Sequence, residues 1–132
     1  SDLLGVPRYN FESLEFLRYG PGQHYKPHPD SSDNEWLEPN AVGAGLRVMT
    51  VFFYLSDVEQ GGETRFPKAK LKVRPEKGKI VVWANAQNNF YKTTKWAIHQ
   101  SMPVKRGLKI AANFWVHPFD YRASEKFALD TC

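Results

Sequence analysis

The sequence predicts a mainly β domain with a sandwich or barrel-like jelly-roll architecture. Short β-branched and aromatic segments alternate along the chain with clusters of Gly, Pro, Asn and Asp, the pattern of strands separated by turns. Only Ala123–Leu129 has the composition of a helix. Seven or eight short strands joined by turns are typical of antiparallel sandwiches and jelly rolls.

The N-terminal part predicts two strands and then a long polar loop. Glu12–Tyr19 alternates loosely and ends at Gly20-Pro21-Gly22, a strong turn signal. Tyr25–His28 forms a short second strand. Ser31–Gly45 is rich in Pro, Asn and Gly and has no periodicity, so we expect a loop. Loops of this length in compact domains often serve as active-site lids.

The rest of the chain predicts six further strands. Leu46–Leu55 is the most convincing, because it is β-branched and aromatic with apolar residues on both faces. Asn85–Lys95 is predicted to be a second polar loop, and the two strands after it are expected to pair around the turn Lys105-Arg106-Gly107. The remaining predicted strands are Glu63–Phe66, Leu71–Arg74, Lys79–Trp83, Trp96–Val104 and Lys109–His117.

Length and charge limit the possible classes of protein. With 132 residues and 15.2 kDa, residues 1–132 are expected to form one domain. The net charge of +4 is modest and no run of five like charges occurs, which argues against a nucleic-acid partner. No apolar stretch approaches the length of a membrane span. Cys132 is the only cysteine, so no intrachain disulfide can form. The endoplasmic reticulum lumen and the cytoplasm both stay open as compartments, and the oligomeric state is unassigned.

The residues His28, Asp30 and His99 predict a metal site. In an extended segment, residues i and i+2 point to the same side, so His28 and Asp30 can meet at one ion. His99 lies far along the chain, and a jelly roll can bring it to the same place. Two imidazoles and one carboxylate form the facial triad of non-haem Fe(II) oxygenases. An H-x-D triplet alone is common, and zinc accepts the same ligands. His24 and His117 are expected to be surface or rim histidines.

Lys109 follows His99 by ten positions and favours iron over zinc. Its ammonium could meet the far carboxylate of a 2-oxo-diacid that chelates the metal. A catalytic zinc site gives no reason for such a lysine. The spacing therefore indicates an oxygenase that uses a dianionic co-substrate.

The segment Leu17–Asp30 (LRYGPGQHYKPHPD) resembles the first metal-ligand motif of the prolyl 4-hydroxylase family. Arg47–Val58 and Gly61–Pro67 are similar to the stretch that follows it, and the block from His99 to Trp115 completes the match. Motifs, order and spacing agree over about residues 12–117. The resemblance implies a double-stranded β-helix, the jelly roll of Fe(II)/2-oxoglutarate-dependent dioxygenases, which hydroxylate peptidyl proline.

The resemblance also implies roles for individual residues. His28, Asp30 and His99 would bind Fe(II). Lys109 and Tyr19 would hold the distal carboxylate of 2-oxoglutarate, with Thr64 near the co-substrate. The positions associated with recognition of a proline-containing peptide are Tyr25, Arg47 and Trp115. Simple core packing is the alternative for Trp115, and a surface charge at the end of a strand is the alternative for Arg47. Ascorbate would restore iron that is oxidised in uncoupled turnovers.

Two departures from the family pattern accompany the resemblance. Gln100-Ser101-Met102 stands where the family has a glycine-rich stretch, and we expect a changed pocket wall without loss of a metal ligand. The family's N-terminal helices and first strand have no counterpart, which suggests an N-terminally truncated domain. Two alternatives stay open: a 2-oxoglutarate oxygenase that acts on another side chain or a free amino acid, and a jelly-roll binding module without catalysis.

Overall fold

A computed structural model of the chain describes residues 4–33, 43–87 and 92–123. The central part of the expected loop Ser31–Gly45 and nearly all of the expected helix Ala123–Leu129 lie outside these ranges. Helical structure within them is confined to the 3₁₀ turns η1 (Arg8–Asn10) and η4 (Lys95–Ala97) and a short segment at 121–123. None of the helices in the described ranges has the length and apolar character that crossing a membrane requires.

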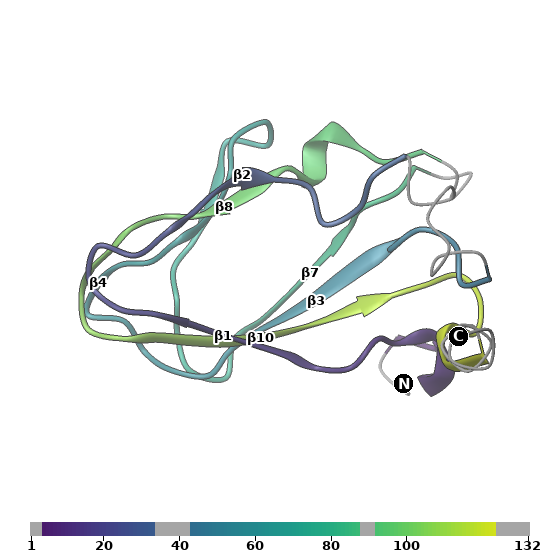
Figure 1. Ribbon diagram of the computed structural model, residues 1–132. Helices are drawn as coiled ribbons and strands as arrows, with labels where there is room; N and C mark the ends of the chain where they lie inside the picture. The colour runs from purple at the N-terminus through teal and green to yellow at the C-terminus, as the bar shows by residue number, and fades with distance from the viewer. Residues whose placement is uncertain (1–3, 34–42, 88–91, 124–132) are drawn as a thin grey trace, which may run out of the picture.

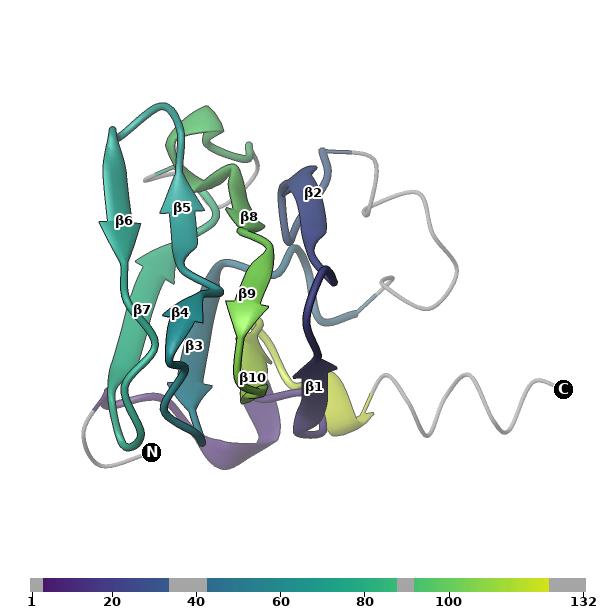
Figure 2. The same cartoon turned by 90° about the vertical axis from the view of Figure 1, so that its left-hand side faces the viewer.

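Two antiparallel four-stranded sheets face each other and form the jelly roll (Figures 1 and 2). The first sheet has the order β1 (Glu15–Tyr19), β10 (Lys109–Val116), β3 (Met49–Tyr54) and β7 (Ile80–Ala84). The second has the order β2 (Tyr25–His28), β8 (His99–Ser101), β5 (Thr64–Phe66) and β6 (Leu71–Val73). A two-stranded sheet joins β4 (Gln60–Gly61) to β9 (Val104–Arg106). The mainly β prediction is confirmed.

The first sheet supplies the core through its inner face. Phe52, Tyr54 and Ala111 are buried there, and Leu17 and Trp83 pack against them. The central strands β3 and β10 carry apolar side chains on this inner face, where the second sheet covers them. Their sequences predicted such buried strands. The outer face of the same sheet exposes Phe16, Ile80 and Val82.

The strand predicted at Trp96–Val104 is wrong in its boundaries and in its pairing. Residues 95–97 form η4 instead, because the Thr94 side chain accepts a hydrogen bond from the Trp96 N–H and caps a 3₁₀ turn. Pro103, which has no N–H to donate, lies between β8 and β9. The predicted hairpin around residues 105–107 does not form, because β9 pairs with β4, whereas β10 pairs with β1 and β3.

The strand β4 was not predicted, because Gly61-Gly62 reads as a turn. Both glycines have positive φ, 80° and 72°. A Cβ on Gly61 would lie 2.3 Å from the Pro103 carbonyl oxygen, so only glycine permits this close approach of β4 to the β8–β9 segment. The glycine pair thus permits the pairing of β4 with β9.

Candidate metal centre

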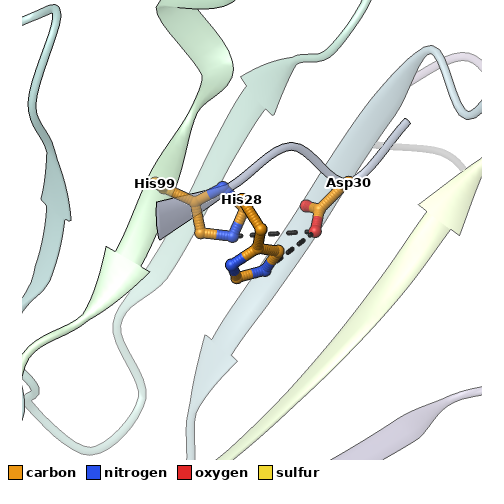
Figure 3. Close-up of side chains that lie close together, drawn as sticks. All are labelled: His28, Asp30 and His99. Atoms are coloured by element: carbon orange, nitrogen blue, oxygen red, sulfur yellow. Dashed lines mark ion pairs between the residues drawn. The ribbon is translucent and has the colours of Figure 1, made fainter. Parts of the chain in front are cut away.

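The side chains of His28, Asp30 and His99 converge between the two sheets (Figure 3). His28 ends β2 and His99 begins β8, and these two residues are directly opposite each other in the antiparallel pair. One ligand atom from each of the three residues lies within 4.8 Å of the others. The Nε2 atoms of His28 and His99 lie 3.7 Å and 3.6 Å from Asp30 Oδ1.

Both imidazoles are oriented by the backbone two residues before them. Nδ1 of His28 lies 2.8 Å from the Lys26 carbonyl oxygen, and Nδ1 of His99 lies 2.9 Å from that of Ala97. A carbonyl can only accept, so Nδ1 carries a proton in each ring and Nε2 is the ring nitrogen that faces Asp30 and can bind a metal. Burial lowers the pKa of His99, although Asp30 partly offsets this effect. His99 is therefore neutral, the form that binds metals.

The Asp30 carboxylate is fixed from its other side. Thr50 Oγ1 donates to Asp30 Oδ2 at 2.6 Å, and Asn85 Nδ2 donates to Thr50 Oγ1 at 2.8 Å. Thr50 and Asn85 are both buried. These two hydrogen bonds hold Asp30 Oδ2, and Asp30 Oδ1 is left directed at the two histidines. Hydrogen-bonded ligand sets of this kind suit metal binding, because they hold the ligands in position before the ion arrives.

A cavity of about 280 Å³ extends from these three residues into the space between the sheets. Its wall is partly apolar and carries polar groups at both ends. The residues that line it include all nine that the sequence analysis selected: Tyr19, Tyr25, His28, Asp30, Arg47, Thr64, His99, Lys109 and Trp115. The jelly roll therefore brings together side chains that are separated by up to 96 positions in the sequence.

Lys109 occupies the deep end of this cavity and is 1% exposed. Its Nζ donates to Ser101 Oγ at 2.9 Å and lies 5.6 Å from the ring centroids of Tyr19, Phe52 and Tyr54. Burial lowers the pKa of Lys109 to about 8, because the surroundings solvate its charge poorly. No ion pair to Lys109 occurs among the described residues. A buried ammonium of this kind favours an anionic ligand.

Other polar groups surround the Lys109 end. Thr64, which is buried, accepts a hydrogen bond of 2.6 Å from the Tyr54 hydroxyl. Burial raises the pKa of Tyr54 to about 12 and also raises that of Tyr19, so both phenols stay protonated donors. Ser101 belongs to the segment that departs from the family pattern, and the departure provides the hydroxyl partner of Lys109.

A network of charged side chains borders the cavity beside Asp30. Arg47 binds Glu12 through two hydrogen bonds, of 2.5 Å and 3.0 Å, and its guanidinium lies 3.6 Å from the Trp115 ring centroid. His117 is 6% exposed and contacts Glu12 and the Gly45 carbonyl, at 2.8 Å each. Burial acts to raise the pKa of Glu12, but the bonds from His117 and Arg47 outweigh it and the pKa is lowered.

The structure of this network shows that the predicted position of His117 is wrong. It also decides between the alternatives given for Arg47 and Trp115. The prediction of a surface or rim position for His117 is wrong, because Glu12, 105 positions away, pairs with it in the interior. Arg47 is not a simple surface charge, and Trp115 lines the cavity rather than only filling the core. His24 does lie exposed in its turn, as expected.

Five residues of the site were missed: Glu12, Thr50, Asn85, Ser101 and His117. Glu12, Thr50 and Ser101 each hydrogen-bond to a residue that was found, whereas Asn85 and His117 hold Thr50 and Glu12 in turn. Their types are common, and only the strand register and the loop geometry give them their partners. For Ser101 the departure from the glycine-rich family pattern was the one available signal.

The comparison with known families settles the relationship of the chain. Residues 14–117 match the 2OG-Fe(II) oxygenase superfamily. The chain belongs to this superfamily. The match spans every residue that lines the cavity.

Individual relatives carry prolyl hydroxylase names. The human prolyl 4-hydroxylase subunit alpha-1 is 38% identical over 122 residues, which cover 88% of this chain and 22% of the relative. A putative prolyl 4-hydroxylase of Acanthamoeba polyphaga mimivirus is 35% identical, with 83% and 46% covered. This chain therefore spans only part of the length of these relatives.

A solved structure shows the same fold. The viral collagen prolyl hydroxylase of Paramecium Bursaria Chlorella virus-1, in its 2OG complex, superposes with a TM-score of 0.72 at 38% identity. The superposition covers 82% of this chain and 59% of the viral one. The jelly-roll prediction and the resemblance to prolyl 4-hydroxylases are thereby confirmed.

Proposed function

We propose that this chain hydroxylates peptidyl proline at the 4-position, using Fe(II), dioxygen and 2-oxoglutarate and releasing succinate and carbon dioxide. One observation carries the proposal. A single cavity joins a pre-oriented pair of imidazoles and a carboxylate to a fully buried lysine. The relatives named prolyl 4-hydroxylase and collagen prolyl hydroxylase support the choice of proline.

His28, Asp30 and His99 are the proposed Fe(II) ligands. Their two neutral nitrogens and one carboxylate are the donor set that non-haem iron takes, and they leave positions open for other ligands. The bound iron supplies the oxidative chemistry with dioxygen. The protein contributes the fixed position of the ligands, through the Lys26 and Ala97 carbonyls and the Thr50 hydroxyl. Ascorbate is proposed as the reductant that maintains Fe(II).

Lys109 and Tyr19 are the proposed partners of the distal carboxylate of 2-oxoglutarate. The Lys109 ammonium at the deep end of the cavity would pair with this carboxylate, and the Tyr19 hydroxyl would donate to it. Thr64 also lines this cavity and is proposed to lie near the co-substrate. Because burial has removed water from Lys109, an incoming carboxylate restores the solvation that the charge has lost.

Tyr25, Arg47 and Trp115 are the proposed contacts of the peptide. Tyr25 is 48% exposed and packs edge-on against His28, with ring centroids 4.2 Å apart. Trp115 Nε1 is a buried donor that lacks a hydrogen-bond partner within the described residues, so it can donate to a peptide carbonyl. Glu12 and Trp115 hold Arg47 beside Asp30, where its guanidinium can direct the peptide backbone.

Incubation with a panel of proline-containing peptides tests the proposal. We expect a mass gain of one oxygen atom on proline that requires both Fe(II) and 2-oxoglutarate and is accompanied by succinate. Succinate without peptide oxidation would indicate an oxygenase for another substrate. If neither Fe(II) nor 2-oxoglutarate binds, the domain would instead be a binding module without catalysis.

A further inference from the structure

Ser101 of β8 lines the catalytic cavity, and the proposed reaction gives it no role. It follows His99 by two residues in the same strand, and both side chains face the cavity. Ser101 therefore belongs to the same cavity wall as a proposed metal ligand. It stands where the family has a glycine-rich stretch, so the resemblance to the family assigns it no function.

The Ser101 hydroxyl has a proton to donate, and none of the described residues accepts it. Lys109 Nζ donates to Ser101 Oγ at 2.9 Å, and an ammonium group has only donors. Ser101 Oγ therefore uses a lone pair in this contact and keeps its O–H for another partner. A hydroxyl with a free O–H, held beside a buried ammonium, suits an anion that approaches the same ammonium.

Thr64 adds a second hydroxyl beside that of Ser101. The two residues are directly opposite each other in the antiparallel pair of β5 and β8, which lie side by side in Figure 2. Residues paired in this way point to the same face of the sheet, with Cβ atoms about 5 Å apart. Both line the cavity, as Lys109 does. The deep end of the cavity thus offers hydroxyl groups next to its one cation.

We infer that Ser101 binds the distal carboxylate of 2-oxoglutarate jointly with Lys109, accepting from the ammonium and donating its O–H to a carboxylate oxygen. The inference rests on the proposed function. The hydroxyl would hold the Lys109 ammonium in place before the co-substrate arrives, which lowers the entropy lost on binding. After binding, it would add a charge-assisted hydrogen bond to the ion pair.

A purely structural role of Ser101 predicts the opposite effect on binding. If the hydroxyl only solvates Lys109 in the free protein, Ser101→Ala leaves the ammonium with less compensation until a carboxylate arrives. Binding of 2-oxoglutarate would then become tighter or stay the same. If Ser101 also donates to the carboxylate, the same substitution removes a contact to a charged group, and binding becomes weaker. The sign of the change therefore separates the two roles.

Calorimetric titration of the Fe(II)-loaded protein under anaerobic conditions, with 2-oxoglutarate and with 2-oxopentanoate, tests the inference. 2-Oxopentanoate has the same carbon chain but carries a methyl group in place of the distal carboxylate. We expect Ser101→Ala to weaken 2-oxoglutarate binding by roughly 5- to 30-fold, the effect of losing a hydrogen bond to a charged group, and to leave 2-oxopentanoate binding within about twofold. Ser101→Thr keeps the hydroxyl and should recover most of the affinity. Ser13→Ala is the matched control, because Ser13 is exposed and precedes β1.

Unchanged or tighter binding of 2-oxoglutarate in Ser101→Ala would overturn the inference. An equal loss of affinity for both ligands would also overturn it, because the effect would then come from the shape of the cavity. Failure of the proposed function gives a different result. If the wild-type protein bound 2-oxopentanoate as tightly as 2-oxoglutarate, the site for the distal carboxylate would be rejected, and the role of Ser101 with it. If Ser101→Ala kept the full wild-type preference for 2-oxoglutarate, only the role of Ser101 would be rejected.

Discussion

The two ends of the catalytic cavity are built in different ways. At the metal end, each histidine is oriented by a carbonyl two residues before it, and His28 and Asp30 are neighbours in one extended segment. At the deep end, Lys109 depends on residues from several strands, among them Ser101 of β8 and Tyr54 of β3. Local hydrogen bonds thus orient the two imidazoles at the first end, whereas Asp30 there and Lys109 at the second end are held by residues from other strands.

This difference separates the energetic roles of the two ends. The metal end gathers two imidazole nitrogens and one carboxylate, all of which are ligand atoms for a cation. The deep end holds a cation that pairs with a hydroxyl and lies near three aromatic rings. Such a charge costs stability until an anion arrives. We therefore expect substitutions at the two ends to affect different ligands, which can be measured independently.

The largest effect is expected at the metal end, from His99→Ala. Removing one of three ligands should weaken Fe(II) binding by more than about 100-fold, since loss of a supporting hydrogen bond alone costs 10- to 100-fold. Turnover should be lost. Metal titration measures the affinity, and His24→Ala serves as the control, because His24 is exposed in its turn. Wild-type Fe(II) affinity in His99→Ala would remove His99 from the ligand set.

Lys109→Ala should act on the other ligand. The distal carboxylate of 2-oxoglutarate would be left without its ion pair, which we expect to weaken binding by roughly 30- to 1000-fold. Fe(II) affinity should stay within about twofold, because additivity holds for groups without shared partners. Lys105→Ala is the matched control, since Lys105 is exposed. Calorimetry with Fe(II) and with 2-oxoglutarate would show whether the two ends of the cavity contribute independently to the binding of their ligands.

A smaller effect is expected from Thr50→Val, which tests how the metal end is prepared. The substitution removes the donor to Asp30 Oδ2 and the acceptor for Asn85. We expect Fe(II) affinity to fall by roughly tenfold, the lower range for a residue that supports a ligand. Thr50→Ser keeps the hydroxyl and should bind Fe(II) nearly as tightly as wild type. Equal losses in both variants would mean that Thr50 acts through packing alone.

The same contrast explains what the sequence could reveal. The triad was predictable because the alternation of a strand places His28 and Asp30 on one side, and Lys109 because of its offset from His99. The roles of Thr50 and Asn85 were not predictable. They depend on how β3 lies beside Asp30 and on the conformation of the loop after β7. The break between β8 and β9 was also missed, because the apolar run hid the effect of Pro103. Local patterns were therefore readable, whereas partners set by strand register were not.

The smallest expected effect is the pH dependence of 2-oxoglutarate binding, which isolates the charge at the deep end. The pKa of Lys109 is lowered to about 8 in the free protein, so this lysine is largely protonated at pH 7 and mostly neutral at pH 8.5. A bound carboxylate favours the charged form, and binding above this pKa must therefore take up a proton. Affinity should fall by roughly fourfold between pH 7 and pH 8.5, from the lost protonated fraction. Lys109→Arg supplies the comparison, because arginine stays charged throughout this range. That variant should bind 2-oxoglutarate more weakly than wild type at pH 7, since the guanidinium differs in shape and reach, yet show little change by pH 8.5. An identical pH profile in both proteins would assign the effect to another group and leave the Lys109 charge without a role in it.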